Sequence, residues 1–448
     1  MTLKKSAIKN VFIPNDWDEV KFRQVFWFGK GLSITKDDLV EEGIPVVSYG
    51  QIHAKANSGT GLTDDLYRYV PEKYLRTGKN CIVKRNDFVF ADTSEDYAGI
   101  GNCVFIDRDD LIFAGYHSII ARPIRQDIYP KYFAYLFLSN CWRDQIRANV
   151  MGIKVFSITQ KLLRDTYVII PPLDEQRAIA TFLDAECAKI DSIIDDLEKQ
   201  LEVLKKLKKS IITQAVIKGI NTAVSMKDSG VEWIGQIPRH WAISRLKYCC
   251  KVKTGPFGTQ LSADEYTDGG TPIINVKNIG YGTVNEDDLD RIPDSVKMRL
   301  STHILRKGDI VFGRKGAVDK HAIIDSEHDG WVQGSDCIRI RVEREIESSF
   351  LNYYFESSGY GDYVVVNSVG STMASINSDI LNNSVVVFPD MQEQLNIVEY
   401  LNERTKLVNS LIAGKEKQLV QIRNHRKALI YEYVTGKKRV MEVTSHAN

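Results

Sequence analysis

The chain has 448 residues, with 59 Lys and Arg against 58 Asp and Glu, and a formal net charge of +1. This length is enough for two or more domains, and the absence of any run near 20 apolar residues or of an opening signal-peptide pattern argues against a membrane or secreted protein. The seven cysteines, an odd number without a CxxC pair, favour reduced thiols in a cytoplasm, whereas a net charge near zero neither favours nor excludes nucleic acid.

Residues 1–170 form the first predicted domain. Short apolar runs at 81–83, 87–90 and 119–121 are typical of buried strands, and residues 132–138 are expected to form a helix. Strands and helices alternate without a single dominant period. We therefore expect a mixed α/β domain in which loops connect the core strands.

Residues 171–222 form the first predicted helical region. Apolar residues recur every seven positions, and the stretch 174–217 contains neither Pro nor Gly. This pattern predicts a long helix, roughly 65 Å at 1.5 Å per residue, that packs against another helix. The predicted contact positions on this helix are Leu183, Ile190, Ile194, Leu197, Leu201, Leu204 and Ile211.

Residues 223–388 form a second predicted domain, 389–440 a second helical region and 441–448 a tail. The second helical region repeats the first at a constant offset of 218 residues, from Pro171 to Pro389, and the tetrapeptide EKQL recurs at 198–201 and 416–419. Even the polar interruption Lys208 has its counterpart in Arg426. A fixed offset favours an internal repeat over a chance likeness of two heptad helices. The contact positions expected here are Leu401, Val408, Ile412, Leu419, Ile422 and Leu429.

The two domains also correspond, but more loosely. Asp87 matches Asp309 at an offset of 222, and Gly152 matches Gly370 at an offset of 218, so insertions and deletions lie between shared landmarks. The predicted fold class is thus two pseudo-repeated, mixed α/β domains separated by a pair of long antiparallel coiled-coil helices. Related domains that keep their strands and vary their loops are expected to recognise different things. A partner with two unlike sites at a set spacing, such as DNA, fits this organisation.

Several motifs resemble specificity subunits of Type I restriction–modification systems. The first is PPLDEQ at 171–176 before the long helix, and the second is SGVEWIGQIPRHW at 229–241. The segments 255–258, 270–275 and 308–312 resemble that family's target-recognition domains. The resemblance covers nearly the whole chain in the same order of parts. The first domain departs from the family's usual pattern at 93–97, where TSEDY stands in place of the GRKG found at 313–316. This departure bears on the DNA sequence that the domain recognises and not on the family.

The resemblance implies two target-recognition domains that read the halves of an asymmetric, interrupted DNA site. It also implies two modification subunits docked on the helical regions and restriction subunits that join them. We expect no cofactor on this chain, with S-adenosylmethionine bound by the modification subunit. A two-domain scaffold that binds other proteins and reads no DNA is the alternative.

The sequence contains no motif for catalysis of its own. Adenine methylation needs an Asn/Asp-Pro-Pro-aromatic loop, and IPPL at 170–173 lacks both the polar and the aromatic residue. No phosphate-binding loop is present, and the histidines are scattered without the spacing of metal ligands. We therefore expect a non-catalytic subunit with no catalytic residue and no metal site.

Base recognition calls for Arg or Lys toward guanine and Asn or Gln toward adenine, on loops that allow close approach. Matched loops in the two domains offer such residues, although a solvated loop residue is the simpler interpretation of any one of them. The candidates are Tyr49, Gln51, Thr93, Ser94 and Lys154 in the first domain and Asn275, Lys277, Asn278, Arg314, Lys315, Ser371 and Thr372 in the second.

Overall fold

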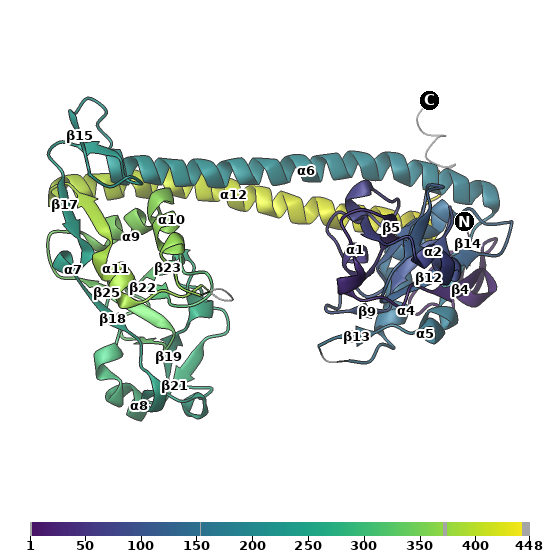
Figure 1. Cartoon of the computed structure of the whole chain (residues 1–448), viewed down its shortest axis with the longest axis horizontal. Helices are drawn as coiled ribbons and strands as arrows, with labels where there is room; N and C mark the ends of the chain where they lie inside the picture. The colour runs from purple at the N-terminus through teal and green to yellow at the C-terminus, as the bar shows by residue number, and fades with distance from the viewer. Residues whose placement is uncertain (1, 153, 371–373, 441–448) are drawn as a thin grey trace. The chain divides into compact units, whose positions relative to one another are not determined.

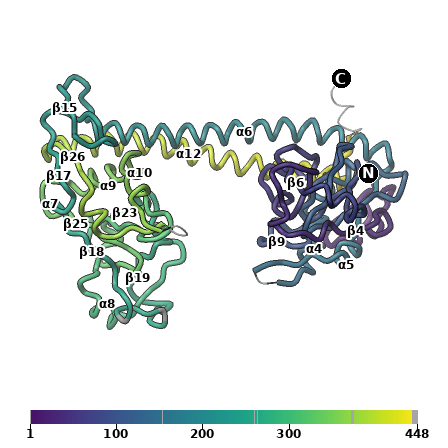
Figure 2. The backbone as a smooth tube through the Cα atoms, in the orientation of Figure 1, coloured from purple at the N-terminus to yellow at the C-terminus, as the bar shows by residue number. Residues whose placement is uncertain are grey.

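The computed structural model describes residues 2–152, 154–370 and 374–440. The chain divides into two compact units: unit 1 comprises 1–197 and 418–448, and unit 2 comprises 198–417. Each unit combines one α/β domain with parts of two long helices, α6 (Leu173–Lys218) and α12 (Met391–Val434). Both appear as continuous helices in Figures 1 and 2. The two long helices expected from the heptad pattern are confirmed.

Unit 1 contains two four-stranded sheets. The first has the order β10-β8-β12-β4, in which all neighbours are antiparallel, and the second has the order β6-β5-β11-β7, in which β5 and β11 are parallel. The strands are β4 (Phe26–Lys30), β5 (Ile44–Val47), β6 (Arg68–Val70), β7 (Ile82–Val83), β8 (Phe88–Ala91), β10 (Cys103–Phe105), β11 (Ile112–Ala114) and β12 (Ser118–Pro123).

Three strand pairs, five short α-helices and four 3-10 helices complete the described part of the domain of unit 1. The pairs are β1 (Leu3–Lys5) with β2 (Phe12–Pro14), β3 (Asp18–Lys21) with β14 (Tyr167–Ile170), and β9 (Thr93–Ser94) with β13 (Phe156–Ser157). The α-helices are α1 (Tyr49–Ile52), α2 (Tyr74–Thr77), α3 (Pro130–Leu138), α4 (Asn140–Arg147) and α5 (Gln160–Asp165).

Unit 2 repeats this plan with a five-stranded sheet, β18-β25-β22-β23-β20, and a three-stranded sheet, β21-β19-β24. Two further pairs, β15-β16 and β17-β26, correspond to β1-β2 and β3-β14. The strands are β15 (Met226–Asp228), β16 (Gln236–Pro238), β17 (Ala242–Arg245), β18 (Cys250–Thr254), β19 (Thr271–Ile274), β20 (Tyr281–Gly282), β21 (Asp290–Ile292), β22 (Ile310–Gly313), β23 (His321–Ile323), β24 (Val332–Gln333), β25 (Cys337–Val342) and β26 (Val385–Phe388). The helices are α7 (Leu246–Cys249), α8 (Asp294–Arg299), α9 (Ser348–Glu356), α10 (Ser358–Val366) and α11 (Ser378–Asn383).

One inner strand of each main sheet, β8 in unit 1 and β22 in unit 2, is called the central strand below. Both are buried at every position, which explains their continuous apolar sequence. Because side chains alternate along a strand, Phe88 and Phe90 of β8 join the core that includes α3 and α4, while Val89 faces a separate core. In β22, Phe312 and Val311 divide in the same way between two cores. The strands and helices expected at 81–83, 87–90, 119–121 and 132–138 are confirmed.

The two long helices run antiparallel within each unit. In unit 1, Arg426 pairs with Asp191 at 2.7 Å, and the rings of Phe182 and Tyr433 lie 4.5 Å apart. In unit 2, Lys205 lies 3.3 Å from Glu416. Part of the predicted contact stripe is half-buried, because two helices alone cannot enclose a whole seam. Buried contact positions are Leu183, Ile190, Leu197, Leu201, Leu401 and Val408; half-buried ones are Ile194, Leu204, Ile211, Ile412, Leu419, Ile422 and Leu429. Among the described residues no helix is long and apolar enough to cross a membrane.

The first turn of each long helix is bonded to its own domain in the same way, which accounts for the repeated Glu-Gln of the two helical regions. The buried Gln176 side chain accepts a hydrogen bond from the Tyr129 amide at 2.7 Å and donates one to the Pro171 carbonyl at 2.8 Å. Gln394 makes the equivalent bonds to Glu347 and Pro389, at 2.7 and 2.9 Å.

Candidate nucleic-acid interface

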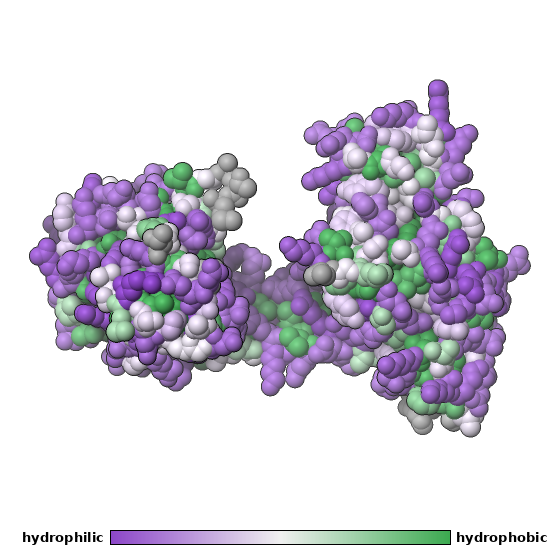
Figure 3. All heavy atoms as spheres, turned by 90° about the horizontal axis from the view of Figure 1, so that it is seen from below, coloured by the Kyte–Doolittle hydropathy of each residue, from purple (hydrophilic) through white to green (hydrophobic). Residues whose placement is uncertain are grey.

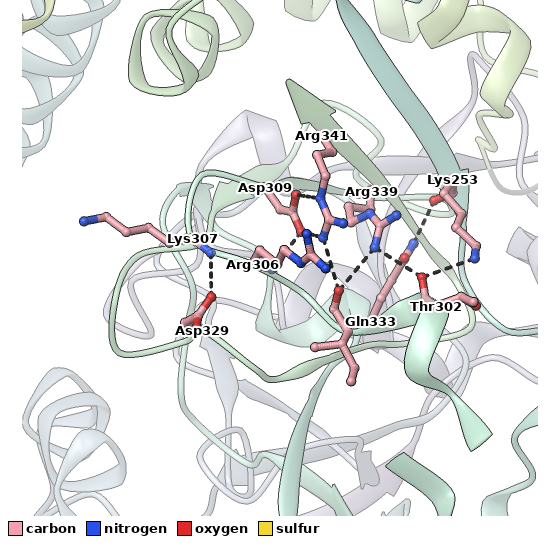
Figure 4. Close-up of polar contacts among 10 residues, drawn as sticks. Lys253, Thr302, Arg306, Lys307, Asp309, Asp329, Gln333, Arg339 and Arg341 are labelled. Atoms are coloured by element: carbon pink, nitrogen blue, oxygen red, sulfur yellow. Dashed lines mark hydrogen bonds and ion pairs between the residues drawn. The ribbon is translucent and has the colours of Figure 1, made fainter. Parts of the chain in front are cut away.

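A buried ion pair holds one end of the central strand in each unit. In unit 2, Asp309 is 1% exposed and accepts hydrogen bonds from Nε and Nη2 of Arg341, both at 2.6 Å (Figure 4). This bonding raises the pKa of Arg341. In unit 1, Asp87 accepts the same two bonds from Arg122, at 2.9 and 2.6 Å. The pair therefore fixes β8 against β12 and β22 against β25 at corresponding positions.

The units differ beside this pair. Arg339 of unit 2 is 6% exposed and donates to the carbonyls of Thr302 and Ile304, at 3.3 and 3.2 Å (Figure 4). Burial and the neighbouring Arg341 lower the pKa of Arg339. At the corresponding register of β12, unit 1 carries Ile120. This arginine is thus part of the interior of unit 2 and not of its loop surface.

The opposite end of β22 carries two of the predicted DNA contacts. Arg314 and Lys315 follow the strand directly, and each lies 3.2 Å from Oδ1 of Asp336. The Arg314 guanidinium also lies over the ring of Phe257, 4.8 Å from its centre. The shared carboxylate and the exposed ring bring these cationic side chains together at one edge of the sheet.

The loop after β19 places its three candidates differently. Asn275 donates to Asp290 at 2.7 Å, and Lys277 pairs with Asp288 at 2.8 Å, so both face acidic neighbours. Asn278 is fully buried and donates to backbone carbonyls, while its oxygen accepts from the Asn275 amide at 3.2 Å. Its side chain therefore holds the loop in shape, which argues against a contact with a base. Ser371 and Thr372 lie outside the described residues.

The candidates of the first domain come from α1, β9 and the segment between α4 and β13. Ser94 is buried and donates to the Asp96 carbonyl at 2.7 Å, and the Gln51 side chain accepts from the Ser48 amide at 3.2 Å, so both have structural partners. Tyr49 is half-buried, which raises its pKa. Lys154 is exposed.

Thr93 does lie in a hollow. It lines a cavity of about 780 Å³ together with Asp92, His117 and the glycine at 115. Asp92 and His117 are joined by a 3.1 Å contact between Oδ1 and Nδ1. Sequence reasoning did not select this pair, because TSEDY at 93–97 was set opposite GRKG. The offset of 222 between Asp87 and Asp309, continued along the strand, would have aligned Asp92 with Arg314.

Hydrophilic side chains cover much of the molecular surface. Figure 3 shows hydrophilic residues over most of the visible face of each unit. Within the described part of the chain, no group of three or more His, Cys, Asp or Glu side chains is placed to hold a metal ion.

The chain is similar in sequence to named specificity subunits. It is 24% identical over 442 residues to the type I restriction enzyme MjaVIII specificity subunit of Methanocaldococcus jannaschii, covering 96% of this chain and 94% of that protein. It is 21% identical over 439 residues to the EcoKI specificity subunit of Escherichia coli, covering 95% and 89%. Both relatives are named specificity subunits, the family that the sequence motifs resemble.

A solved structure from a study of complex assembly and conformational transition of the type I R-M system shares the fold. It has a TM-score of 0.66 and 17% sequence identity, and the match covers 95% of this chain and 99% of that one. The family model described as the type I restriction modification DNA specificity domain matches residues 14–211 and again 238–421. These two matches coincide with the repeated frame of the two units, so the chain belongs to the family of type I restriction–modification specificity subunits and carries two recognition domains.

Proposed function

We propose that this chain binds an asymmetric, bipartite duplex DNA site through its two domains, one half-site to each. The observation that carries the proposal is the contrast between a repeated frame and unlike loop side chains. Both units hold the central strand with a buried Asp–Arg pair, yet the residue five positions beyond that Asp is Asp92 in one unit and Arg314 in the other. A shared frame with different polar groups at its edge is what recognition of two different base sequences requires.

The chemistry of unit 2 supports this function. Arginine recognises guanine in the major groove through two hydrogen bonds, and a nearby lysine suits a phosphate or a second acceptor. Arg314 keeps 23% of its side chain exposed and Lys315 keeps 45%. Asp336 is close enough to orient both side chains. A guanine edge or a DNA phosphate would compete with Asp336 for their hydrogen bonds.

We further propose that the chain acts as a scaffold for two modification subunits and for restriction subunits, with S-adenosylmethionine bound by the modification subunit. The relatives named above are parts of type I restriction enzymes, and the similar structure comes from a study of complex assembly. The long helices offer exposed apolar side chains for such contacts. These include Val203, Leu207, Leu407, Leu411 and Val420, between 47% and 63% exposed.

The test is a comparison of half-site preferences in the complex with the modification subunit. Arg314→Ala combined with Lys315→Ala should weaken discrimination in one half-site, by roughly 1–3 kcal/mol for a lost bidentate contact, and leave the other half-site unchanged. Binding to duplex libraries, or a methylation map of a host that carries the system, measures the base preference at each half-site.

The matched control removes the same charge from the opposite end of the same sheet. Lys251 and Lys307 flank the buried Asp309–Arg341 end of β22, where Lys251 pairs with Glu343. Lys251→Ala with Lys307→Ala should leave both preferences intact. Equal losses at both half-sites from the Arg314 and Lys315 changes would contradict the assignment. A complex that assembles but shifts no duplex would instead favour a scaffold without DNA recognition.

A further inference from the structure

Asp92 and Arg314 occupy the same backbone position in their two units. The Asp92 amide donates to the His117 carbonyl at 3.2 Å, and the Arg314 amide donates to the Asp336 carbonyl at 2.7 Å. Their own carbonyls accept from the amides of residues 158 and 376, at 2.7 and 2.9 Å. The preceding residues are in register as well, since Ala91 faces Ser118 and Gly313 faces Cys337.

The side chains at these positions form acid–base contacts of opposite arrangement. In unit 2 the base, Arg314, follows the central strand, and the acid, Asp336, precedes the neighbouring strand; they lie 3.2 Å apart. In unit 1 the acid, Asp92, follows the central strand, and His117 precedes its neighbour, 3.1 Å away. The acid and the base have therefore exchanged strands between the two units.

Both pairs are open to a ligand and held in place by tight backbone packing. His117 and Asp92 keep 59% and 35% of their side chains exposed. Beside each pair, two glycines allow two loops to approach closely. A Cβ added at Gly31 would lie 1.9 Å from the Gly115 carbonyl oxygen, and a Cβ added at Gly255 would lie 1.9 Å from the Gly334 carbonyl oxygen. His117 has a φ of 52°, a left-handed conformation that costs a non-glycine residue free energy and is common at functional sites.

We infer that Asp92 and His117 are the specificity-determining pair of the first domain, and that they contact a base carrying an exocyclic amino group in the major groove. This inference rests on the proposed DNA binding. A carboxylate accepts from the amino groups of cytosine or adenine, whereas the major-groove edge of guanine presents only acceptors and is matched by arginine. The exchange of acid and base between Arg314–Asp336 and Asp92–His117 thus gives the two domains opposite hydrogen-bonding demands.

The decisive experiment moves the pair of the second domain into the first. Asp92→Arg with His117→Asp should change one base pair of the first half-site from an amino-bearing base to guanine, and leave the second half-site unchanged. Aspartate tolerates the left-handed conformation at 117. The measurement is a methylation map of a host expressing the full complex, with binding of duplexes that vary that base pair to separate cytosine from adenine.

A second variant tests the inference if the Asp92→Arg, His117→Asp protein does not fold. Asp92→Ala removes the acceptor alone and should reduce discrimination at the same base pair by roughly 5- to 150-fold, the equivalent of one good base contact. The matched control exchanges Arg85 and Asp109, an exposed ion pair at 2.7 Å at the other end of β8. Arg85→Asp with Asp109→Arg should alter neither half-site.

The outcomes separate the inference from the function beneath it. If the wild-type complex binds no duplex DNA, the proposed function itself fails. If it binds, and Asp92→Ala leaves the first half-site as selective as before, the pair does not determine specificity. A change that appears in the second half-site instead would equally overturn the assignment of Asp92 and His117.

Discussion

Glu356 gives unit 2 a stability that depends on pH. This residue ends α9 and faces α6, where the Lys208 ammonium lies 3.8 Å from its carboxylate. Its side chain is 11% exposed, and a Cβ at Gly282 would come within 2.2 Å of its Oε1. Burial raises the pKa of Glu356 to about 7, with Lys208 opposing the shift only in part.

A second buried group that responds to pH lies near Glu356. A cavity of about 450 Å³ beside it is lined by Lys205, Lys209, Asp319 and His321. Burial lowers the pKa of His321 to about 4, so this ring stays neutral above pH 5. The unfolded chain would protonate His321, and also His303, whose pKa burial lowers, so these residues oppose Glu356 as the pH falls below 6.5. Both histidines are common to the wild type and Glu356→Gln, so the difference between the two proteins isolates Glu356.

The sign and the size follow from linkage. Because the folded state holds the Glu356 proton more tightly than the unfolded chain does, the contribution of Glu356 to stability is greatest below pH 4.5 and falls as the pH rises toward 7. A pKa raised from 4.5 to about 7 corresponds to about 3 kcal/mol of unfolding free energy. Glu356→Gln mimics the protonated form, so it should exceed the wild type by less than about 1 kcal/mol near pH 5 and by about 3 kcal/mol at pH 8.

Denaturant unfolding at pH 5 and pH 8 measures this difference. Glu202→Gln is the matched control, because Glu202 also pairs with a lysine of α6, Lys206, but is 65% exposed. That control should show no gain at pH 8. A Glu356→Gln protein that is less stable than the wild type at pH 8, or equally changed at both pH values, would refute the reasoning.

The remaining predictions concern the buried supports of the two units. Arg122→Met and Arg341→Met each leave a buried aspartate without its ion-pair partner and should destabilise their own unit by about 3–5 kcal/mol. Hydrogen exchange resolved by segment should show lost protection in that unit alone, and an equal loss in both units would contradict the prediction. Leu183→Ala and Leu401→Ala remove fully buried contacts between a long helix and its domain and should each cost about 2–5 kcal/mol in denaturant unfolding. Unchanged midpoints would show that these leucines do not hold the helices.

The long helices could be predicted because their signal is local and extended. A seven-residue apolar period sustained from Leu183 to Ile211 has no competing interpretation once Pro and Gly are absent. The repeat at a fixed offset then identified the second helix. Burial along the stripe was less predictable: Leu419 is half-buried whereas Leu401 is fully buried, because the domains and not the heptads decide where the seam is covered.

The position of the candidate loops in the fold could be predicted, and the contacts of their side chains less so. The loops after β8 and β22 were identified from the matched strands, and Arg314 and Lys315 do lie together there. Asn278 looked like a base-reading amide, but it binds the backbone of its own loop, and a strand followed by Asn-x-x-Asn fits either role. His117 looks in the sequence like an ordinary surface or core histidine, because its partner lies 25 positions away and only the register of β8 with β12 brings the two together.

The arrangement of each unit lets recognition change without loss of the fold. The buried Asp–Arg pair and the exposed pair lie at opposite ends of one central strand, five residues apart from Asp87 to Asp92, or about 16 Å along the backbone at 3.3 Å per residue. Substitutions separated by more than about 10 Å and sharing no partner have nearly additive effects. Exchanging the exposed pair should therefore leave the contribution of Asp87 and Arg122 to stability intact. The two units already differ in this way: the buried pair is kept in both, and the exposed pair is reversed.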